Sequence, residues 1–345
     1  MNVQNRKRRP LFVYVVAFLF SMIMIVMGIS VGSQAILPSE VMKIFNAYFF
    51  DIGSVDPIHA QIVIDIRLPR TLLAFLVGAA LSAAGVAFQG FLRNPLADPY
   101  TLGVSSGAAL GAVIVIFFQL SIPLLGNFTL PTISIGSGLL TLLFLLWFAR
   151  ALRRSLSAET IILIGIIISA FLGACLSLFI ALAGEELRQA IQWLLGSVGM
   201  RGWDYVYLMI PFFLFGTILI ASCLKELNAF AFGQDFARHI GVSVQKRGVV
   251  ILIGAAILTG TAVAVAGTIG FVGLVVPHFV RMLIGPNHVH LLPVSMLTGG
   301  GFLIAADISA RTLLAPMELP LGVITAIIGA PIFAYLLFVQ QRRKN

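Results

Sequence analysis

The sequence is poor in charge. Of its 345 residues only 10% are Asp, Glu, Lys or Arg, whereas 59% are hydrophobic, and the mean hydropathy is +1.05. A soluble domain carries about a quarter of its residues as charged ones. A soluble fold of this length could not bury so much apolar surface, so the composition indicates that the solvent is lipid.

The sequence also lacks the signatures of a metal site, a disulfide framework or an enzyme. Its two cysteines, Cys175 and Cys223, both lie within apolar runs, where a small buried hydrophobe is the expected role. We find no Walker A loop, no HExxH and no G-x-S-x-G motif. We therefore expect no catalytic residue, no metal ligand and no cofactor in this chain.

Short segments that alternate between apolar and polar residues are absent too, which excludes an outer-membrane barrel. Long apolar runs instead predict an all-α polytopic membrane protein with one domain at 11–340, between a basic tail at 1–10 and a short tail at 341–345. The run that begins at Leu11 is too long for a signal peptide and lacks a clear cleavage site, so we take it as a retained span. The run 248–285 is long for one span, and Gly267, Gly270 and Gly273 mark the expected bend. The ten predicted spans are 11–33, 70–92, 102–120, 129–149, 160–183, 205–224, 248–268, 269–285, 291–309 and 319–340.

The few charges that are present are unevenly distributed. Loops on the side of the two termini hold 16 of the 22 basic residues, and the opposite side holds nine of the 13 acidic residues. The positive-inside rule then predicts that both termini are cytoplasmic. The net charge of +9 thus follows from topology, and with no soluble basic domain it does not indicate nucleic-acid binding.

Ionisable residues are missing from the middle of the predicted spans. A transporter driven by protons or sodium usually needs an Asp, Glu or His there. Asp307 lies near a span end, and His278 lies toward the cytoplasmic side, where a packed or interfacial histidine is expected. If the chain moves cargo uphill, the energy must enter through a partner. A secondary transporter and a membrane scaffold subunit stay open as alternatives.

Small residues recur at helical spacing. Gly103, Gly107 and Gly111 lie four residues apart, and Ala79–Ala83 and Gly299–Gly301 are similar. Such faces let helix backbones approach closely, so tight internal packing is expected, with a pore-facing role as the alternative.

The longest cytoplasmic loop, 225–247, is too polar to cross the membrane. Gly233, Ala237 and Gly241 recur every four residues, which predicts one smooth face on a short helix. A smooth face would seat deeply in a groove of another protein. The alternative is an amphipathic helix on the membrane surface.

Two further motifs flank the second span. On the cytoplasmic side, Pro95 and Pro99 predict a rigid turn at 93–99. On the outer side, Arg67, Arg70 and Arg311 are cations where few are expected. Guanidinium groups bind carboxylates bidentately, so these arginines could receive acidic residues of an external partner. Pairing with local acids such as Asp65 or Asp307, or with lipid phosphates, is the alternative.

Together these motifs resemble the iron-siderophore, haem and cobalamin permease family of ABC importers. The similar stretches cover about residues 67–340. The resemblance implies two permease subunits, identical or sister chains, in a bacterial cytoplasmic (inner) membrane. It also implies two cytoplasmic ATPases that hold ATP and Mg, and an extracytoplasmic substrate-binding protein. The stretches are RLPRTLLAFLVGAALSAAGVAFQGFLRNPLADPYTLGVSSGA, GTIGFVGLVVPHFVRMLIG, LIAADISAR and ELPLGVITAIIGAPIFAYLL.

The resemblance also implies roles for individual residues. Arg67, Arg70 and Arg311 match arginines that meet acidic residues of the binding protein. Glu159 departs from the small hydroxyl pair of the cobalamin-type members. Ferric siderophore is the expected cargo, with haem and cobalamin as alternatives. The residues matched to the ATPase-coupling segment are Gly233, Asp235, Ala237, Arg238 and Gly241, and those matched to the cytoplasmic gate are Asn94, Leu96, Ser157, Ala158, Glu159 and Thr160.

Overall fold

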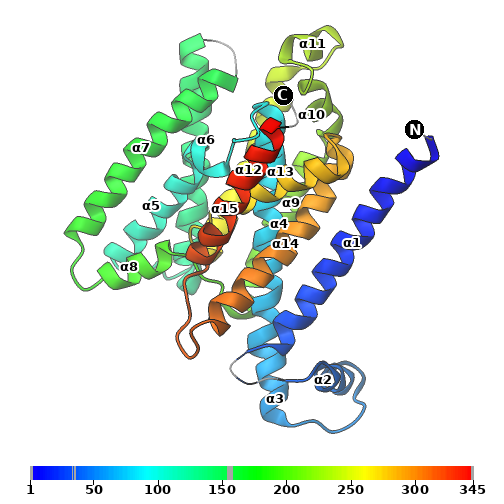
Figure 1. The fold of residues 1–345 in the computed structure, drawn as a ribbon. Helices are drawn as coiled ribbons and strands as arrows, with labels where there is room; N and C mark the ends of the chain where they lie inside the picture. Colours follow the sequence, from blue (N-terminus) through cyan, green and yellow to red (C-terminus); the bar gives the residue numbers. More distant parts are fainter. Residues whose placement is uncertain (1–2, 33, 35, 154–157, 343–345) are drawn as a thin grey trace.

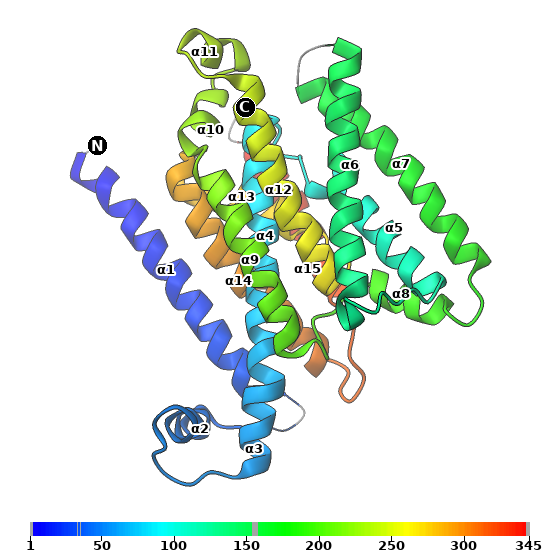
Figure 2. The same ribbon diagram turned by 180° about the vertical axis from the view of Figure 1, so that it is seen from behind.

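The computed structural model describes residues 3–32, 34, 36–153 and 158–342 (Figures 1 and 2). These ranges are helical, with no strand. The helices are α1 Val3–Ser30, α2 Pro38–Phe50, α3 Pro57–Gln61, the π-helical turn η1 Ile62–Arg67, α4 Leu68–Phe91, η2 Pro99–Leu102, α5 Val104–Phe117, η3 Gly126–Phe128, α6 Thr129–Arg153, α7 Ala158–Leu182, α8 Leu187–Leu194, α9 Gly202–Ala221, α10 Leu224–Phe230, α11 Gln234–His239, α12 Val244–Ala266, α13 Val272–Ile284, α14 His288–Thr312 and α15 Leu321–Arg342.

Each of the ten predicted spans coincides with an apolar helix. Seven helical segments in the described ranges are long and apolar enough to cross a membrane. The other three spans correspond to the shorter apolar helices Val104–Phe117, Val272–Ile284 and Leu321–Leu336. The prediction of an all-α polytopic membrane protein is therefore confirmed.

The helices surround α4 and α12, whose most apolar stretches are the most deeply buried of the seven long segments. Helix α1 lies on one flank of the bundle, and α5 to α8 lie on the other (Figure 1). Both termini lie at the end of the bundle that carries α10 and α11, which we call the α11 end. The opposite end carries α2 and α3, and we call it the α2 end. The shared end agrees with an even number of spans.

The small residues pack helices together, as expected. A Cβ added to Gly78 of α4 would collide with the carbonyl of Gly299 in α14. Cβ atoms on Gly107 and Gly111 of α5 would collide with Thr141 and Ser137 of α6. The close approach of these backbones confirms the packing interpretation.

The expected bend in the run 248–285 is present. Helix α12 ends at Ala266 and α13 begins at Val272. At the break, Gly267 has a positive φ of 73°, and a Cβ there would collide with the carbonyl of Trp193. Ser197 donates its backbone N–H to the Ala266 carbonyl at 2.8 Å, so this interruption is hydrogen-bonded within the protein.

The α2 end contains helical structure that we did not predict. The second span does not open at Arg67 to Arg70, because helix already begins at Pro57 and runs without a break to Phe91. Asp56 caps this start by accepting a hydrogen bond from the Ile58 backbone N–H at 2.9 Å. Helix α2 precedes it within a stretch that the span analysis left unassigned. Arg67 and Arg70 consequently lie on consecutive turns of a long helix.

Candidate functional site

The three predicted arginines come together at the α2 end. Arg70 donates to Asp307 at 2.9 to 3.1 Å and to Glu318 at 2.8 and 3.0 Å. Arg311 lies one turn after Asp307 on α14, and its Nε is 3.6 Å from the Asp307 carboxylate. The pairing with Asp307 that we considered as an alternative is therefore present, and Glu318 is a partner that the sequence analysis missed.

Arg67 and Arg311 both bind the carboxyl-terminal end of α1. Arg67 is 5% exposed and donates to the carbonyls of Ile29 at 3.1 Å and Ser30 at 2.7 Å, and to that of Gln34. Arg311 donates to the Gly28 carbonyl at 2.6 Å. The last carbonyls of a helix have no partner within it, and a cation there also meets the negative end of the helix dipole. These two guanidinium groups act as a cap for α1.

This arginine cluster carries a surplus of positive charge. It contains three guanidinium groups but only two carboxylates, those of Asp307 and Glu318. The arginines and Glu318 line a hollow of about 500 Å³ together with Gly32, Gln34 and Pro316. The hydrogen bond from Arg70 lowers the pKa of the Glu318 carboxyl, so this group stays ionised at neutral pH. Glu318, whose side chain is 50% exposed, is the part of the cluster that a partner could reach, and Arg70 lies largely buried beneath it.

At the α11 end, three segments far apart in the sequence line a second hollow of about 490 Å³. Leu92 and Arg93 follow α4, Ala158 and Glu159 begin α7, and Gln234, Asp235 and Arg238 belong to α11. Residues assigned by resemblance to the gate and to the coupling segment therefore meet at one place. The sequence analysis included Arg93 in the turn at 93–99 but gave it no role in the site, and in the structure it has a positive φ of 52°.

The predicted turn at 93–99 is present as far as Asp98. Asn94 accepts a hydrogen bond from the Leu96 backbone N–H at 2.9 Å, and Leu96 is exposed. Asp98 then caps η2 by accepting from the Tyr100 N–H at 3.1 Å, so Pro99 starts a short helix. Burial among neighbouring atoms raises the pKa of the Asp98 carboxyl to about 6, although part of its surface reaches solvent.

The second predicted gate segment is only partly described. Glu159 is exposed in the first turn of α7, where a negative charge favours the helix dipole, and Ala158 is half-buried beside it. Thr160 is buried. Ser157 lies outside the described residues.

The predicted smooth face of the coupling segment is wrong in its geometry. Helix α11 covers only Gln234–His239, and Gly233 and Gly241 lie beyond its ends with φ of 117° and 88°. Ala237 is fully buried in the core of this chain. The small residue faces inward because the loop must pack closely on its own bundle.

The outward face of the same segment is bulky and apolar instead. Phe232, Phe236 and Ile240 recur every four residues and are 74%, 48% and 56% exposed. The two phenyl rings contact each other at 5.5 Å between centroids. Asp235 and Arg238 form an exposed ion pair at 2.9 Å beside them. The segment thus presents an apolar ridge flanked by charges.

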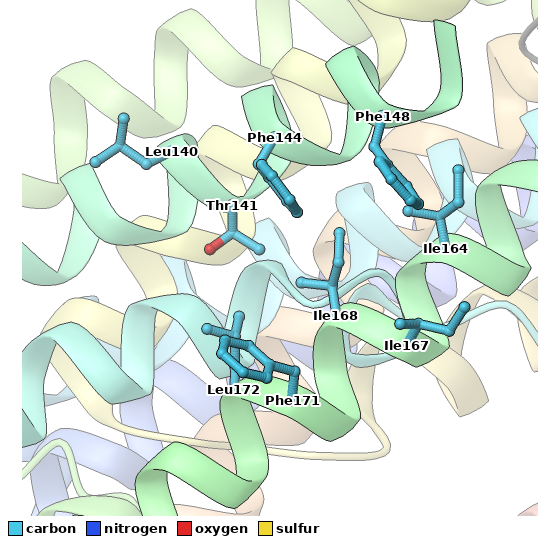
Figure 3. Close-up of a pocket in the computed structure, with 9 residues that line it drawn as sticks. All are labelled: Leu140, Thr141, Phe144, Phe148, Ile164, Ile167, Ile168, Phe171 and Leu172. Atoms are coloured by element: carbon cyan, nitrogen blue, oxygen red, sulfur yellow. The ribbon is translucent and has the colours of Figure 1, made fainter. Parts of the chain in front are cut away.

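A third hollow of about 480 Å³ lies between α6 and α7 (Figure 3). Phe144 and Phe148 of α6 face Ile164 and Ile168 of α7 across it. Its only polar lining side chain, Thr141, donates its hydroxyl to the Ser137 carbonyl at 2.8 Å. Because no free polar group lines it, this groove fits apolar side chains or lipid and has nothing to orient a polar cargo.

Comparison with known proteins decides the family. The model of the FecCD transport family matches residues 19–339. The chain belongs to the FecCD transport family. It is 53% identical over 331 residues to YvrB of Bacillus subtilis, an uncharacterized ABC transporter permease protein, with 95% of this chain and 94% of YvrB covered. It is 40% identical to BtuC, the cobalamin import system permease protein of Halobacterium salinarum, with 81% and 74% covered.

Other relatives of this FecCD-family chain are named for different cargoes. They include permease proteins for molybdate in Haemophilus influenzae, hemin in Yersinia pestis and Fe(3+) dicitrate in Escherichia coli, at 39%, 41% and 39% identity over 81 to 84% of this chain and 84 to 86% of theirs. A solved inward-facing structure described as a metal-chelate type ABC transporter superposes with a TM-score of 0.82 at 33% identity, and covers 95% of this chain and 99% of that one. The family and its fold are thus shown, and the cargo differs among its members.

Proposed function

We propose that this FecCD-family chain is the pathway-forming permease subunit of an ATP-driven importer for a metal chelate, most specifically a ferric siderophore. The observation that carries the proposal is the shared hollow of Arg93, Glu159 and Asp235 at the α11 end. A segment that binds an ATPase must touch the segments that open the pathway, because the nucleotide state can act only through such contacts.

The orientation follows from the charges. The α11 end carries Arg93, Lys225, Arg238 and Lys246, and the positive-inside rule makes it cytoplasmic. The α2 end then faces outward, in the direction from which an extracytoplasmic binding protein would deliver cargo. We propose accordingly that the chain is a multi-pass protein of a bacterial cytoplasmic membrane.

The partners follow from the two ends. We expect two ATPases, which hold ATP and Mg, to receive the ridge of Phe232, Phe236 and Ile240. At the other end, a carboxylate of the binding protein would displace Glu318 from Arg70 and neutralise the surplus charge of the arginine cluster. A second permease subunit, identical or a sister chain, would complete the pathway.

The identity of the cargo is the most detailed part of the proposal. Several relatives are named as permeases for ferric citrate or ferric hydroxamate, which supports an iron chelate. Cobalamin and hemin are the competing cargoes, supported by relatives of similar identity. Among the described residues no group of three or more His, Cys, Asp or Glu side chains could hold a metal ion.

The test is ATPase stimulation in nanodiscs. The chain is co-expressed with candidate ATPase and binding-protein partners and assayed with ferric siderophores, hemin and cobalamin in turn. Stimulation by one loaded binding protein supports the importer and names the cargo. Failure to associate with any ATPase contradicts the proposal and favours a secondary transporter or a scaffold subunit.

The docking role needs variants that leave the fold intact. Charge reversal at Arg67 or Arg311 is unsuitable, since both cap α1 from buried positions. Arg70→Gln is expected to weaken stimulation by the binding protein about tenfold or more. The matched variant Glu318→Gln frees Arg70 and is expected to preserve or strengthen docking. Equal loss in both variants would show that the pair matters for the fold and not for docking.

A further inference from the structure

Helix α2 carries three distinct faces along its 13 residues. Val41 and Ile44 face inward and pack with Ile29 of α1 and with Val63 and Ile64 of η1. An apolar stripe of Pro38, Met42, Phe45 and Phe49 follows at helical spacing, with Met42 63% and Phe49 64% exposed. A polar stripe of Ser39, Lys43 and Asn46 runs along the remaining side and is also exposed.

The apolar stripe is unusual for a helix outside the bundle. Phe45 and Phe49 stack with 6.1 Å between ring centroids, and Tyr48 meets Phe49 edge-on at 5.2 Å. In water this group of rings would remain exposed, at a cost proportional to its apolar area. Val41 and Ile44 close the core beneath, and the half-buried Phe45 packs against it, so the exposed Met42 and Phe49 are not needed for the packing of this chain. This exposed part of the stripe needs a cover from outside.

The depth of α2 is set by α1. The apolar part of α1, Pro10–Ser30, has 21 residues and spans about 31 Å at 1.5 Å per residue. This equals the hydrocarbon thickness of a bilayer, about 30 Å. Ile29, on which α2 packs, therefore lies at the boundary between acyl chains and headgroups.

The direction of α2 fits this boundary. In both Figures 1 and 2 α2 is seen end-on, whereas α1 and α4 run along the plane of the picture. Helix α2 thus lies nearly perpendicular to the spanning helices and parallel to a membrane surface. Helix α1 beside it exposes Ile23, Val26 and Met27, so the lipid-facing surface continues up to α2.

We propose that α2 is an interfacial helix that lies in the headgroup layer at the α2 end. Met42, Phe45 and Phe49 reach into the acyl chains, and Lys43 points to phosphates and water. Only the assignment to the outer leaflet rests on the proposed orientation. The other occupant, a binding protein, is less suited because the stripe is uncharged, whereas the surplus charge lies in the arginine cluster on other elements.

The test measures which solvent each stripe meets. Single cysteines replace Met42 and Phe49 on the apolar stripe, and Lys43 and Asn46 on the polar stripe, in a Cys175→Ser, Cys223→Ser background. Each cysteine is spin-labelled in nanodiscs of 3:1 phosphatidylcholine and phosphatidylglycerol. We expect collisions with oxygen, relative to a water-soluble nickel chelate, to be at least threefold more frequent at 42 and 49 than at 43 and 46.

Two outcomes would overturn the proposal. Equal, low oxygen preference at all four sites would show that the apolar stripe faces water. The second outcome is that positions 42 and 49 show no preference for oxygen in the nanodisc alone and become less accessible to the nickel chelate when the binding protein is added. This result would show a protein-docking surface. Since all four residues are exposed, their substitution leaves the core unchanged, and an unchanged melting temperature of each unlabelled variant checks this. The result is independent of ATPase stimulation, so failure of the importer proposal would not produce either outcome.

Discussion

The two ends of the bundle place their charged residues differently. At the α2 end, Arg67 and Arg311 are buried and bind backbone carbonyls, so their charge serves the packing of α1. At the α11 end, the Asp235–Arg238 pair lies at the surface beside the protruding side chains of Phe232, Phe236 and Ile240. A charged residue at the end of a span is thus not automatically a surface group, and a small residue in a connecting loop is not automatically the contact face.

The largest effect is expected from removing the cap of α1. Arg67→Ala removes a donor from the buried carbonyls of Ile29 and Ser30 at the end of α1, and from the Gln34 carbonyl that lies beyond it. We expect the free energy of unfolding to fall by about 3 kcal/mol or more, since charged hydrogen bonds and unmet acceptors each contribute. Thermal unfolding in detergent measures the change.

The matched control for Arg67 is Arg201→Ala, at the same end of the bundle. Arg201 is less buried and lies 5.0 Å over the ring of Tyr205, so its removal should cost less than about 1 kcal/mol. Equal melting temperatures for the two variants would contradict the capping role of Arg67. The arginines at the α2 end would then differ from the charges at the α11 end only in their exposure.

The next largest effect concerns the apolar ridge at the α11 end. Phe232→Ser combined with Phe236→Ser should weaken association with the ATPase by about tenfold to a hundredfold, because aromatic anchors dominate such interfaces. The melting temperature should stay unchanged, since both rings are exposed. Co-purification and titration of the ATPase measure the affinity.

The control for the ridge keeps its apolar character. Phe232→Leu with Phe236→Leu should retain most of the affinity. Unchanged affinity in the serine variant would exclude the ridge as the ATPase contact. It would favour the alternative that the sequence left open, in which this segment lies on the membrane surface.

A smaller effect is expected at Asp98, which is less buried than Arg67 and less exposed than Asp235. Its folded pKa of about 6 exceeds the usual value for Asp, so the folded protein binds a proton more tightly than the unfolded chain. The unfolding free energy therefore falls as pH rises from about 4 to about 6 and is flat above. Asp98→Asn should remove this fall and stabilise the protein at pH 7.5 by on the order of 1 to 2 kcal/mol, discounted for partial exposure.

Melting curves of the wild type and of Asp98→Asn at pH 4.5 and pH 7.5 test this prediction. Because the other titrating groups are the same in both proteins, their contributions cancel in the difference between the two melting temperatures. Asn keeps the cap on the Tyr100 N–H, whereas Asp98→Ala would lose it. Parallel pH profiles for the wild type and Asp98→Asn would show that the carboxyl is well solvated.

The sequence predicted the spans well because apolar length and glycine breaks are local signals. The bend at Gly267 is such a case, since a positive φ and a close carbonyl are conditions that glycine meets. The extension of α4 down to Pro57 was missed, because Asp65 and Arg67 make that stretch look like a loop. Its charge is tolerated since the helix continues beyond the apolar layer.

The site residues were harder to interpret for a different reason. Three arginines could be grouped from sequence, but their partners come from α1 carbonyls more than 30 residues away and from Glu318, and no local pattern reports such contacts. In 225–247 the spacing of Gly233, Ala237 and Gly241 predicted one smooth helix face, but only Ala237 lies within α11, where it is buried, and the two glycines lie beyond the ends of the helix. The neighbouring repeat of Phe232, Phe236 and Ile240 was an equal signal for the outward face.

The smallest effect is expected for the ion pair on α11. Asp235 and Arg238 are 2.9 Å apart, but their side chains are 86% and 49% exposed, so water and salt screen the attraction. Asp235→Asn should change the unfolding free energy by less than about 0.5 kcal/mol. Glu318→Gln, which removes one carboxylate of the Arg70 pair at the other end, should cost more, because Arg70 is largely buried. Thermal unfolding of both variants at low and high salt measures this, and a larger loss for Asp235→Asn would reverse the contrast between the two ends. Such a loss would mean that α11 is held by its surface charge and not by the burial of Ala237.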